Sequence, residues 1–194
     1  MLEFSSTNGV SWHERAKQKV MPDYTLLARR ASAHRVLGKK RVLTIGSWDM
    51  LHIGHARYLL RAWELSENGV LIVGVDSDRA VKKYKGALRP MIPQEERIEM
   101  LTYLWFVDYV AMLDDVDERG HWQYGLVKAI RPDVFVAVEG SYSEKQREMI
   151  KRYSGELNVL PRQAENTSTS GFIQSSIKGH IGAFLDFVER EKHE

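Results

Sequence analysis

Two histidines three residues apart are the first residues of this sequence that could carry chemistry. His52 and His55 lie in the segment GSWDMLHIGH, residues 46–55, where an apolar run ends and a helical pattern begins. In a first helical turn the two imidazoles share a face, and Gly54 between them leaves that face open. A helix N-terminus already favours phosphate, so two imidazoles there favour a polyphosphate. The spacing alone is also compatible with metal ligands, although no third ligand lies nearby in the sequence, and with surface histidines.

Three cationic side chains further along the sequence could contact a ligand. Lys85, beside Gly86 in a predicted loop, can reach a phosphate as a point charge, or it is one of several solvated lysines. Arg89 precedes a proline, which holds it extended and able to point into a cleft, or it is a surface arginine. Arg97 lies on a predicted helix next to two glutamates, where an ion pair on the helix surface is the alternative.

Hydroxyl groups and carboxylates mark two further helix starts. The hydroxyls open the last predicted helix and offer a second phosphate site, with a plain N-cap as the alternative. The carboxylates follow a predicted strand, and we expect them to form a solvated helix start rather than a metal site. The hydroxyl residues are Ser168, Thr169 and Ser170, and the carboxylates are Asp114, Asp115 and Asp117.

The elements that must position these residues alternate along the chain. Apolar runs predict buried strands, and apolar residues at helical spacing predict helices between them. Such alternation predicts a doubly wound α/β fold with a parallel sheet, in which ligands bind beyond the carboxyl ends of the strands. The predicted strands are 41–46, 70–78, 107–113, 132–138 and 157–161, and the predicted helices are 55–67, 93–104, 120–130, 143–153 and 167–191.

Residues 1–40 differ from the rest, because they are polar and basic with Pro22 between two short helical stretches. We expect a basic N-terminal extension that packs on the domain or is solvated, with a docking arm for a partner subunit as the alternative. The expected domain boundaries are 1–40 for this extension, 41–178 for the α/β domain and 179–194 for a C-terminal helix.

Composition restricts the classes of function. The 194 residues carry a net charge of +2, which gives no general reason to expect nucleic acid or an anionic membrane as partner. The sequence has no cysteine, which excludes disulfides, a thiol nucleophile and a Cys-ligated zinc site. The chain shows no secretory signal and no long apolar span, so we expect a cytoplasmic protein without a membrane segment.

The segment at residues 46–55 resembles the signature of the nucleotidyltransferase superfamily that includes cytidylyltransferases and class I aminoacyl-tRNA synthetases. The usual pattern is Gly-x-Phe-Asp followed by His-x-Gly-His. Trp48 replaces the phenylalanine, and Ser47 takes a place usually held by threonine or cysteine. The positions that match the signature are Gly46, Asp49, His52, Gly54 and His55.

Later segments agree with this family in order and spacing, so that the resemblance covers about residues 41–178. Residues 73–101 resemble the sugar-phosphate members, and the nearest pattern is the adenylyltransferase domain of the bacterial ADP-heptose synthesis enzyme. That segment contains Lys85-Gly86, Arg89-Pro90 and Arg97. Residues 131–142 and 165–173 follow as they do in the family, and the latter contain the Ser-Thr-Ser stretch.

The resemblance implies transfer of a nucleoside monophosphate from a nucleoside triphosphate to a phosphorylated acceptor, with Mg²⁺ and release of pyrophosphate. It implies catalytic roles for His52, His55 and Lys85. The nucleotide-binding residues that it implies are Gly46, Ser47, Trp48, Asp49, Gly54, Arg97, Ser168, Thr169 and Ser170. The acceptor-binding residues that it implies are Arg89, Glu139 and Tyr142.

One departure bears on the acceptor. Glu139 stands where the heptose-type enzymes usually carry a lysine, which leaves the acceptor open among phosphorylated sugars, polyols and amino alcohols. The Lys-Gly and Arg-Pro segment favours ATP over CTP as donor. A synthetase is disfavoured, since the chain lacks a Lys-Met-Ser-Lys-type loop and a tRNA-binding domain. A non-catalytic nucleotide sensor on the same fold is the remaining alternative, and a homodimer is expected.

Overall fold

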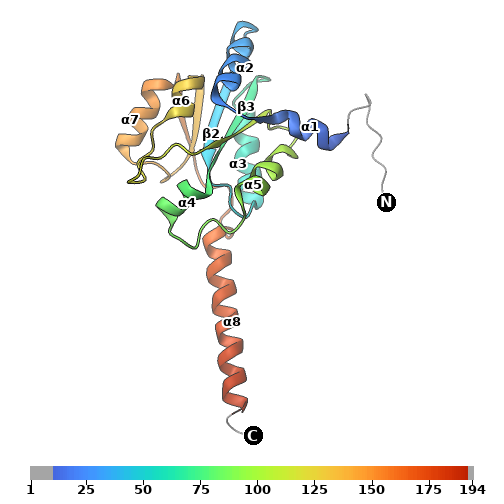
Figure 1. Ribbon diagram of the computed structural model, residues 1–194, viewed down its shortest axis with the longest axis vertical. Coiled ribbons are helices and arrows are strands. Elements are labelled where there is room, and N and C mark those ends of the chain that lie inside the picture. Colours follow the sequence, from blue (N-terminus) through green and yellow to red (C-terminus); the bar gives the residue numbers. More distant parts are fainter. Residues whose placement is uncertain (1–10, 192–194) are drawn as a thin grey trace.

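The computed structural model describes the backbone of residues 11–191 and their side chains except those of residues 12, 183 and 185–191. The strands are β1 Val20–Met21, β2 Arg41–Gly46, β3 Val70–Asp76, β4 Tyr109–Leu113, β5 Val134–Val138 and β6 Glu156–Leu160. They form one parallel sheet in the order β1-β4-β3-β2-β5-β6. Helices surround the sheet (Figure 1). The helices are α1 Trp12–Lys19, α2 Tyr24–Val36, α3 Ile53–Glu64, α4 Asp78–Lys85, α5 Gln94–Thr102, α6 Gly125–Ile130, α7 Glu144–Tyr153 and α8 Thr169–Glu191.

Helices cover both faces of this sheet, which confirms the predicted doubly wound α/β architecture. Consecutive residues of a strand point to opposite faces, so Val42 and Leu71 belong to one core cluster while Leu43 and Ile72 belong to the other. The first cluster includes residues of α3 and α5, and the second includes residues of α2, α6 and α7. Burial on both faces explains why the strand sequences are continuously apolar.

The chain turns from one half of the sheet to the other at β2. The strands β3 and β5 pair with β2 on its two sides, so the direction of winding reverses there. Such a reversal opens a crevice at the carboxyl ends of the strands, where α/β proteins bind ligands. The segment that carries His52 and His55 begins at this point, because Gly46 is the last residue of β2.

The helices α4 and α6 differ from the sequence-based expectation. Lys85 was expected in a loop, but it is the last residue of α4, which Ser77 begins as an N-cap by accepting the Ala80 amide at 3.0 Å. The helix expected at 120–130 is shorter, because Tyr124 adopts a left-handed conformation with φ of 61° and α6 starts only at Gly125.

The N-terminal segment adds to the sheet. Val20 and Met21 form a short strand parallel to β4, and Leu27 and Ala31 of α2 are fully buried in the core. Residues 20–36 therefore pack on the domain. This agrees with the expectation of a packed extension rather than a docking arm for this part of residues 1–40.

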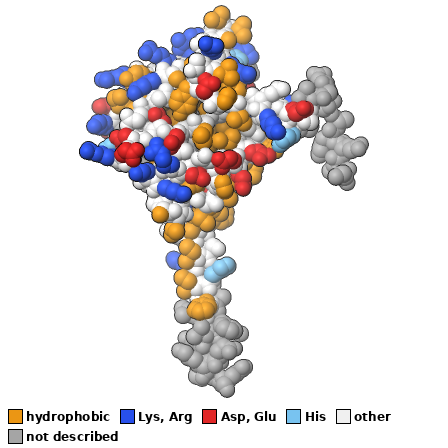
Figure 2. Space-filling model, viewed as in Figure 1, with side chains coloured by type: hydrophobic (Ala, Val, Ile, Leu, Met, Phe, Trp, Pro, Cys, Tyr) orange, Lys and Arg blue, Asp and Glu red, His pale blue; other side chains and the backbone are white. Residues whose placement is uncertain are grey.

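The long helix α8 leaves the domain, and Figure 1 shows it as a projecting rod. Apolar side chains lie along the part of it nearest the domain (Figure 2). Those described as exposed are Phe172, Ile177, Ile181 and Phe184. The side chains of the apolar residues Leu185, Phe187 and Val188, further along the helix, lie outside the described residues. Among residues 11–191, no helix is long and apolar enough to cross a membrane.

Candidate active site

A cavity of about 330 Å³ lies where the carboxyl end of β2 meets the N-termini of α3 and α8. Most of the residues singled out in the sequence line it, although they lie up to 124 positions apart, from Gly46 to Ser170. Those residues are Gly46, Ser47, Trp48, His52, Gly54, His55, Lys85, Arg89, Tyr142, Ser168, Thr169 and Ser170. Among the described residues its lining also contains Arg162 but no aspartate or glutamate, so the cavity is suited to a polyanion.

His52 is the N-cap of α3, and its orientation follows from that role. Its Nδ1 accepts a hydrogen bond from the Gly54 amide at 3.1 Å. Because Nδ1 accepts, the proton of the neutral ring is on Nε2, where it can be donated to a ligand. A Cβ atom at Gly54 would lie 2.9 Å from the His52 ring, so glycine is required for this close approach.

The two imidazoles stack, with ring centroids 3.9 Å apart and planes inclined by 23°. Burial, together with the neighbouring His52 and Lys85, lowers the pKa of His55 to about 4. Burial also lowers the pKa of His52. Both rings are therefore neutral near pH 7 and can donate hydrogen bonds without adding a charge. Nδ1 of His55 is buried and has no hydrogen-bond partner among the described residues.

Lys85 reaches the cavity from the end of α4. Its Nζ donates to the hydroxyl of Ser47 at 2.7 Å, and Ser47 follows directly on β2. Burial lowers the pKa of Lys85, as do the charges of Arg89 and Arg97, while Asp76 and Asp49 raise it. Lys85 thus lies among other cations, and an anionic ligand would relieve their mutual repulsion.

The N-terminus of α8 forms a second wall of the cavity. Ser168 accepts the Gly171 amide at 3.1 Å and so acts as the N-cap. The buried hydroxyl of Thr169 donates to the carbonyl oxygen of Asp49 at 2.7 Å and ties this helix to the segment after β2. Ser170 is exposed at the cavity, in the first turn. Free N–H groups of two helices, α3 and α8, are therefore directed to one cavity, which favours phosphate groups.

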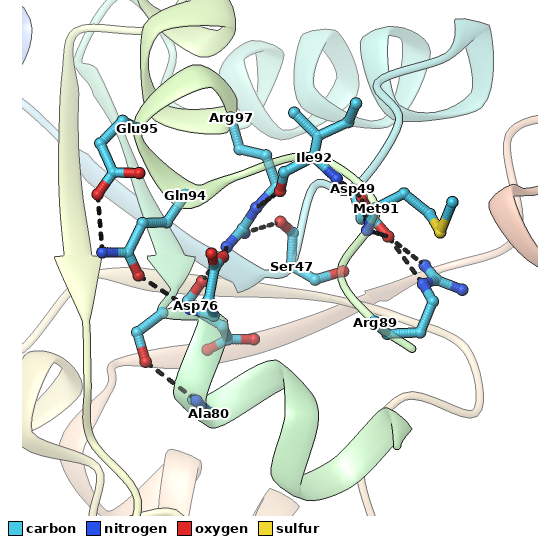
Figure 3. A network of polar contacts seen from close by, with 12 residues as sticks. Ser47, Asp49, Asp76, Ala80, Arg89, Met91, Ile92, Gln94, Glu95 and Arg97 are labelled. Carbon is cyan, nitrogen blue, oxygen red and sulfur yellow. Dashed lines mark hydrogen bonds and ion pairs between the residues drawn. The ribbon is translucent and has the colours of Figure 1, made fainter. Parts of the chain in front are cut away.

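Asp49 does not line the cavity but holds the loop beside it. Its fully buried carboxylate pairs with Arg89 at 2.7 Å and accepts the amides of Met91 and Ile92 at 3.0 Å (Figure 3). Burial alone would raise the pKa of Asp49, but these two amides and the Arg89 side chain hold its pKa below the ordinary value. Asp49 therefore fixes the position of Arg89, which lines the cavity.

Arg97 is also a positioning residue in this structure. Its guanidinium is buried and donates to the carbonyl oxygens of Ser47, Asp76 and Ile92, and it pairs with Asp78 at 2.7 Å (Figure 3). The alternative of an ion pair on the helix surface is wrong, because Arg97 points into the domain. It joins the ends of β2 and β3 to the loop before α5.

A second and larger cavity, of about 1060 Å³, adjoins the first. The two share Ser47, Lys85 and Tyr142 in their linings. The larger one adds polar and aromatic residues that the sequence analysis did not single out, with the exception of Asp115. They include Asp76, Tyr84, Asp115, His121, Trp122 and Lys145. Glu139 is exposed and lines neither cavity.

The three acidic residues of the segment before α6 have separate environments. Asp115 lines the larger cavity and accepts the amide of Gly125, the first residue of α6. Asp114 pairs with Arg79, and Asp117 with His121. Only Asp115 meets the expectation of a helix start, and it is not simply solvated, since burial raises its pKa. Among the described residues no group of three or more histidine or acidic side chains could hold a metal ion.

Known proteins resemble this chain in sequence. It is 32% identical over 158 residues to "Bifunctional protein HldE" of Geobacter sulfurreducens, which covers 80% of this chain and 30% of the relative. The protein of the same name from Nitratiruptor is 43% identical over 109 residues, which covers 56% of this chain and 22% of the relative. The chain thus matches less than a third of the length of these relatives.

Solved structures share the fold. The lipopolysaccharide core biosynthesis protein of Thermoplasma volcanium superposes with a TM-score of 0.52 at 22% identity, over 64% of this chain and 97% of that one. The pantoate-beta-alanine ligase of Francisella tularensis superposes with a TM-score of 0.50 at 13% identity, over 75% of this chain and 67% of that one. The family model described as cytidylyltransferase-like matches residues 43–177, which include every cavity-lining residue considered above. The chain therefore belongs to the cytidylyltransferase-like family of nucleotidyltransferases.

Proposed function

We propose that the chain transfers AMP from ATP to a phosphorylated sugar, polyol or amino alcohol and releases pyrophosphate. The observation that carries the proposal is the place of Lys85 on the wall between two cavities. The smaller cavity has cations, helix N-termini and no carboxylate, which suits a triphosphate. The larger one has the room and the mixed lining that a small polar acceptor needs.

In this proposal an oxygen of the acceptor phosphate attacks the α-phosphorus of ATP, and the bond to the bridging oxygen of pyrophosphate breaks. The attacking oxygen already carries negative charge, so the step needs no strong general base. Catalysis then depends on positioning and on stabilising charge around the α-phosphate. Neutral His52 and His55 donate hydrogen bonds to the phosphates, and Lys85 bridges donor and acceptor.

The proposed nucleotide site differs in part from the sequence-based expectation. We place the β- and γ-phosphates at Ser168, Ser170 and the first turn of α8. Asp49 and Arg97 act through the loops that they hold, because their polar atoms are already engaged within the domain. We place Arg89 with the nucleotide rather than the acceptor, since it lines only the smaller cavity.

Mg²⁺ is expected with the triphosphate, but the residues around the smaller cavity offer it few ligands. It prefers oxygen ligands, including one or two carboxylates with the substrate phosphates. The lining of the smaller cavity contains no carboxylate, and the nearby carboxylate of Asp49 is occupied by Arg89, Met91 and Ile92. In our proposal the metal ion therefore enters as a counter-ion of ATP, held by phosphates and water, and no protein step depends on it.

Pyrophosphate release tests the proposal. We would measure it with ATP, CTP, GTP and UTP, each against a panel of sugar, polyol and amino-alcohol phosphates. We expect turnover with ATP and one class of acceptor. Lys85→Ala or His52→Ala should then lower kcat by about 10²–10³-fold without unfolding the protein. Nucleotide binding without turnover on any acceptor would refute the transferase and favour the non-catalytic sensor.

The homodimer and the cytoplasmic location stay predictions. Exposed apolar residues on α8, among them Ile177, Ile181 and Phe184, are the surface that a second copy would cover. Sedimentation velocity on the whole chain measures the oligomeric state directly. A monomer at concentrations well above those used in the activity assay would contradict the expected dimer.

A further inference from the structure

We propose that Asp76 and Asp115 determine acceptor specificity by accepting hydrogen bonds from hydroxyl groups of the acceptor, which rests against the aromatic wall of Trp122 and Tyr142. The inference rests on the proposed function, which supplies the phosphorylated acceptor. It goes further by naming the residues that choose among acceptors and by favouring a polyhydroxylated body over an amino alcohol.

Asp76 presents one unused acceptor atom to the cavity. It is the last residue of β3, half-buried, and its Oδ2 accepts the Tyr84 hydroxyl at 2.6 Å. Its Oδ1 accepts no hydrogen bond from the described residues. Burial raises the pKa of Asp76, as expected for a carboxylate that has lost water without gaining enough donors. A hydroxyl group of a ligand would supply the missing donor.

Asp115 repeats this arrangement at the end of the neighbouring strand. It follows β4, lines the same cavity and accepts the Gly125 amide through Oδ2. Burial raises its pKa, although the Gly125 amide, the Trp122 indole and Lys128 act in the opposite direction. The charge of Asp115 is close enough to raise the pKa of Asp76. Because Asp76 and Asp115 line the same cavity, the two carboxylates can serve one small ligand.

Aromatic rings form another wall of the cavity. Trp122 and Tyr142 stack with centroids 5.7 Å apart and planes inclined by 27°, and Tyr124 lies 4.2 Å from Trp122. Flat apolar faces beside carboxylates match a molecule with C–H groups on one side and hydroxyl groups on the other. A sugar or polyol has that distribution of polar and apolar atoms.

Both carboxylates already have cationic neighbours. Lys85 and Arg97 oppose the rise that burial causes in the pKa of Asp76, and Lys128 opposes it for Asp115. The phosphate of the acceptor would lie at the wall shared by the two cavities, next to Lys85 and the Ser47 hydroxyl.

Binding measured without turnover tests the inference. The full chain is saturated with a non-hydrolysable ATP analogue and titrated by calorimetry with D-mannose 1-phosphate and with phosphoethanolamine. We expect mannose 1-phosphate to bind at least about tenfold more tightly. Asp115→Asn should weaken mannose 1-phosphate by about tenfold or more and leave the ATP analogue and phosphoethanolamine unchanged. Asp114→Asn is the matched control, since its carboxylate pairs with Arg79 and lines neither cavity.

A measurement on the unaltered protein covers the case in which Asp115→Asn disturbs α6. Monodeoxy analogues of mannose 1-phosphate each remove one hydroxyl, and at least one should bind about tenfold more weakly than the parent. Tighter binding of phosphoethanolamine, equal binding of all deoxy analogues, or no binding of mannose 1-phosphate would each overturn the inference. If the hydroxyl preference holds but no pyrophosphate is released, the proposed function fails and the assignment of the cavity stands.

Discussion

Replacing Asp49 by asparagine tests whether Asp49 holds the active-site loop or contacts the nucleotide. The carboxylate is fully buried, pairs with Arg89 at 2.7 Å and accepts the amides of Met91 and Ile92. Asparagine keeps the shape but removes the charge and turns one acceptor atom into a donor. The partly buried guanidinium of Arg89 would then face an amide instead of a carboxylate.

The size of the effect follows from this burial. Breaking a buried ion pair by removing one partner typically costs about 3–5 kcal/mol of unfolding free energy. For a domain of this size each kcal/mol lowers Tm by about 2–4 °C. At the lower end of the cost, Asp49→Asn should therefore lower Tm by roughly 6–12 °C.

Thermal unfolding followed by circular dichroism measures this shift. The matched control is Glu64→Gln, because Glu64 also pairs with an arginine, Arg61, but is 45% exposed. An exposed pair contributes only about 0–1 kcal/mol, so the control should melt close to the wild type. If Asp49→Asn melts with the control and instead loses affinity for ATP, the carboxylate contacts nucleotide and the structural role assigned to it is wrong.

Two other predictions concern the histidine pair. Gly54→Ala would place a Cβ atom 2.9 Å from the ring of His52, so we expect the ring to move and ATP affinity to fall by about tenfold or more, as for the loss of one hydrogen bond to a charged group. Gly179→Ala is its control, since a Cβ atom there meets nothing within 4 Å, and calorimetric titration with ATP compares the two. The pKa of His55, lowered to about 4 by burial, predicts pH-dependent stability. In the unfolded chain this ring takes up a proton below about pH 6.5, whereas in the folded chain it stays neutral down to about pH 4. The free energy of unfolding is therefore highest above pH 6.5 and decreases as the pH falls. Thermal unfolding should show that the free energy of unfolding falls by on the order of 1–2 kcal/mol between pH 7 and pH 5. The fall should be smaller in His55→Gln, and an equal fall in the wild type and the variant would contradict the prediction.

The fold could be predicted largely from the sequence, because continuous apolar runs identify buried parallel strands. The runs at β2, β3, β4 and β5 each matched a strand to within two residues at either end. The helix α4 was missed, because it has only eight residues and buries only Ala80 and Val81 among charged neighbours, with Ser77 as its N-cap. The strand β1 was missed because two residues show no periodicity.

The candidate site was predicted less evenly. His52, His55 and Lys85 meet in one cavity, which their common place at the carboxyl ends of the strands made predictable. The burial of Arg97 was not predictable, since its neighbours in sequence are solvated glutamates and its partners lie up to 50 positions away. The larger cavity escaped notice because Asp76, Asp115 and Trp122 come from different elements and form no motif.

The short pairing of β1 with β4 has a practical consequence for cutting the chain. The change in composition near residue 40 suggests that a fragment beginning at residue 41 would be a complete domain. Such a fragment would lose the partner of Val110 and Ala111 and leave β4 as a bare edge, open to pairing with another molecule. It would also uncover the core surface that Leu27 and Ala31 fill. We therefore expect fragments that keep residues 11–40 to stay in solution and those that start at residue 41 to aggregate.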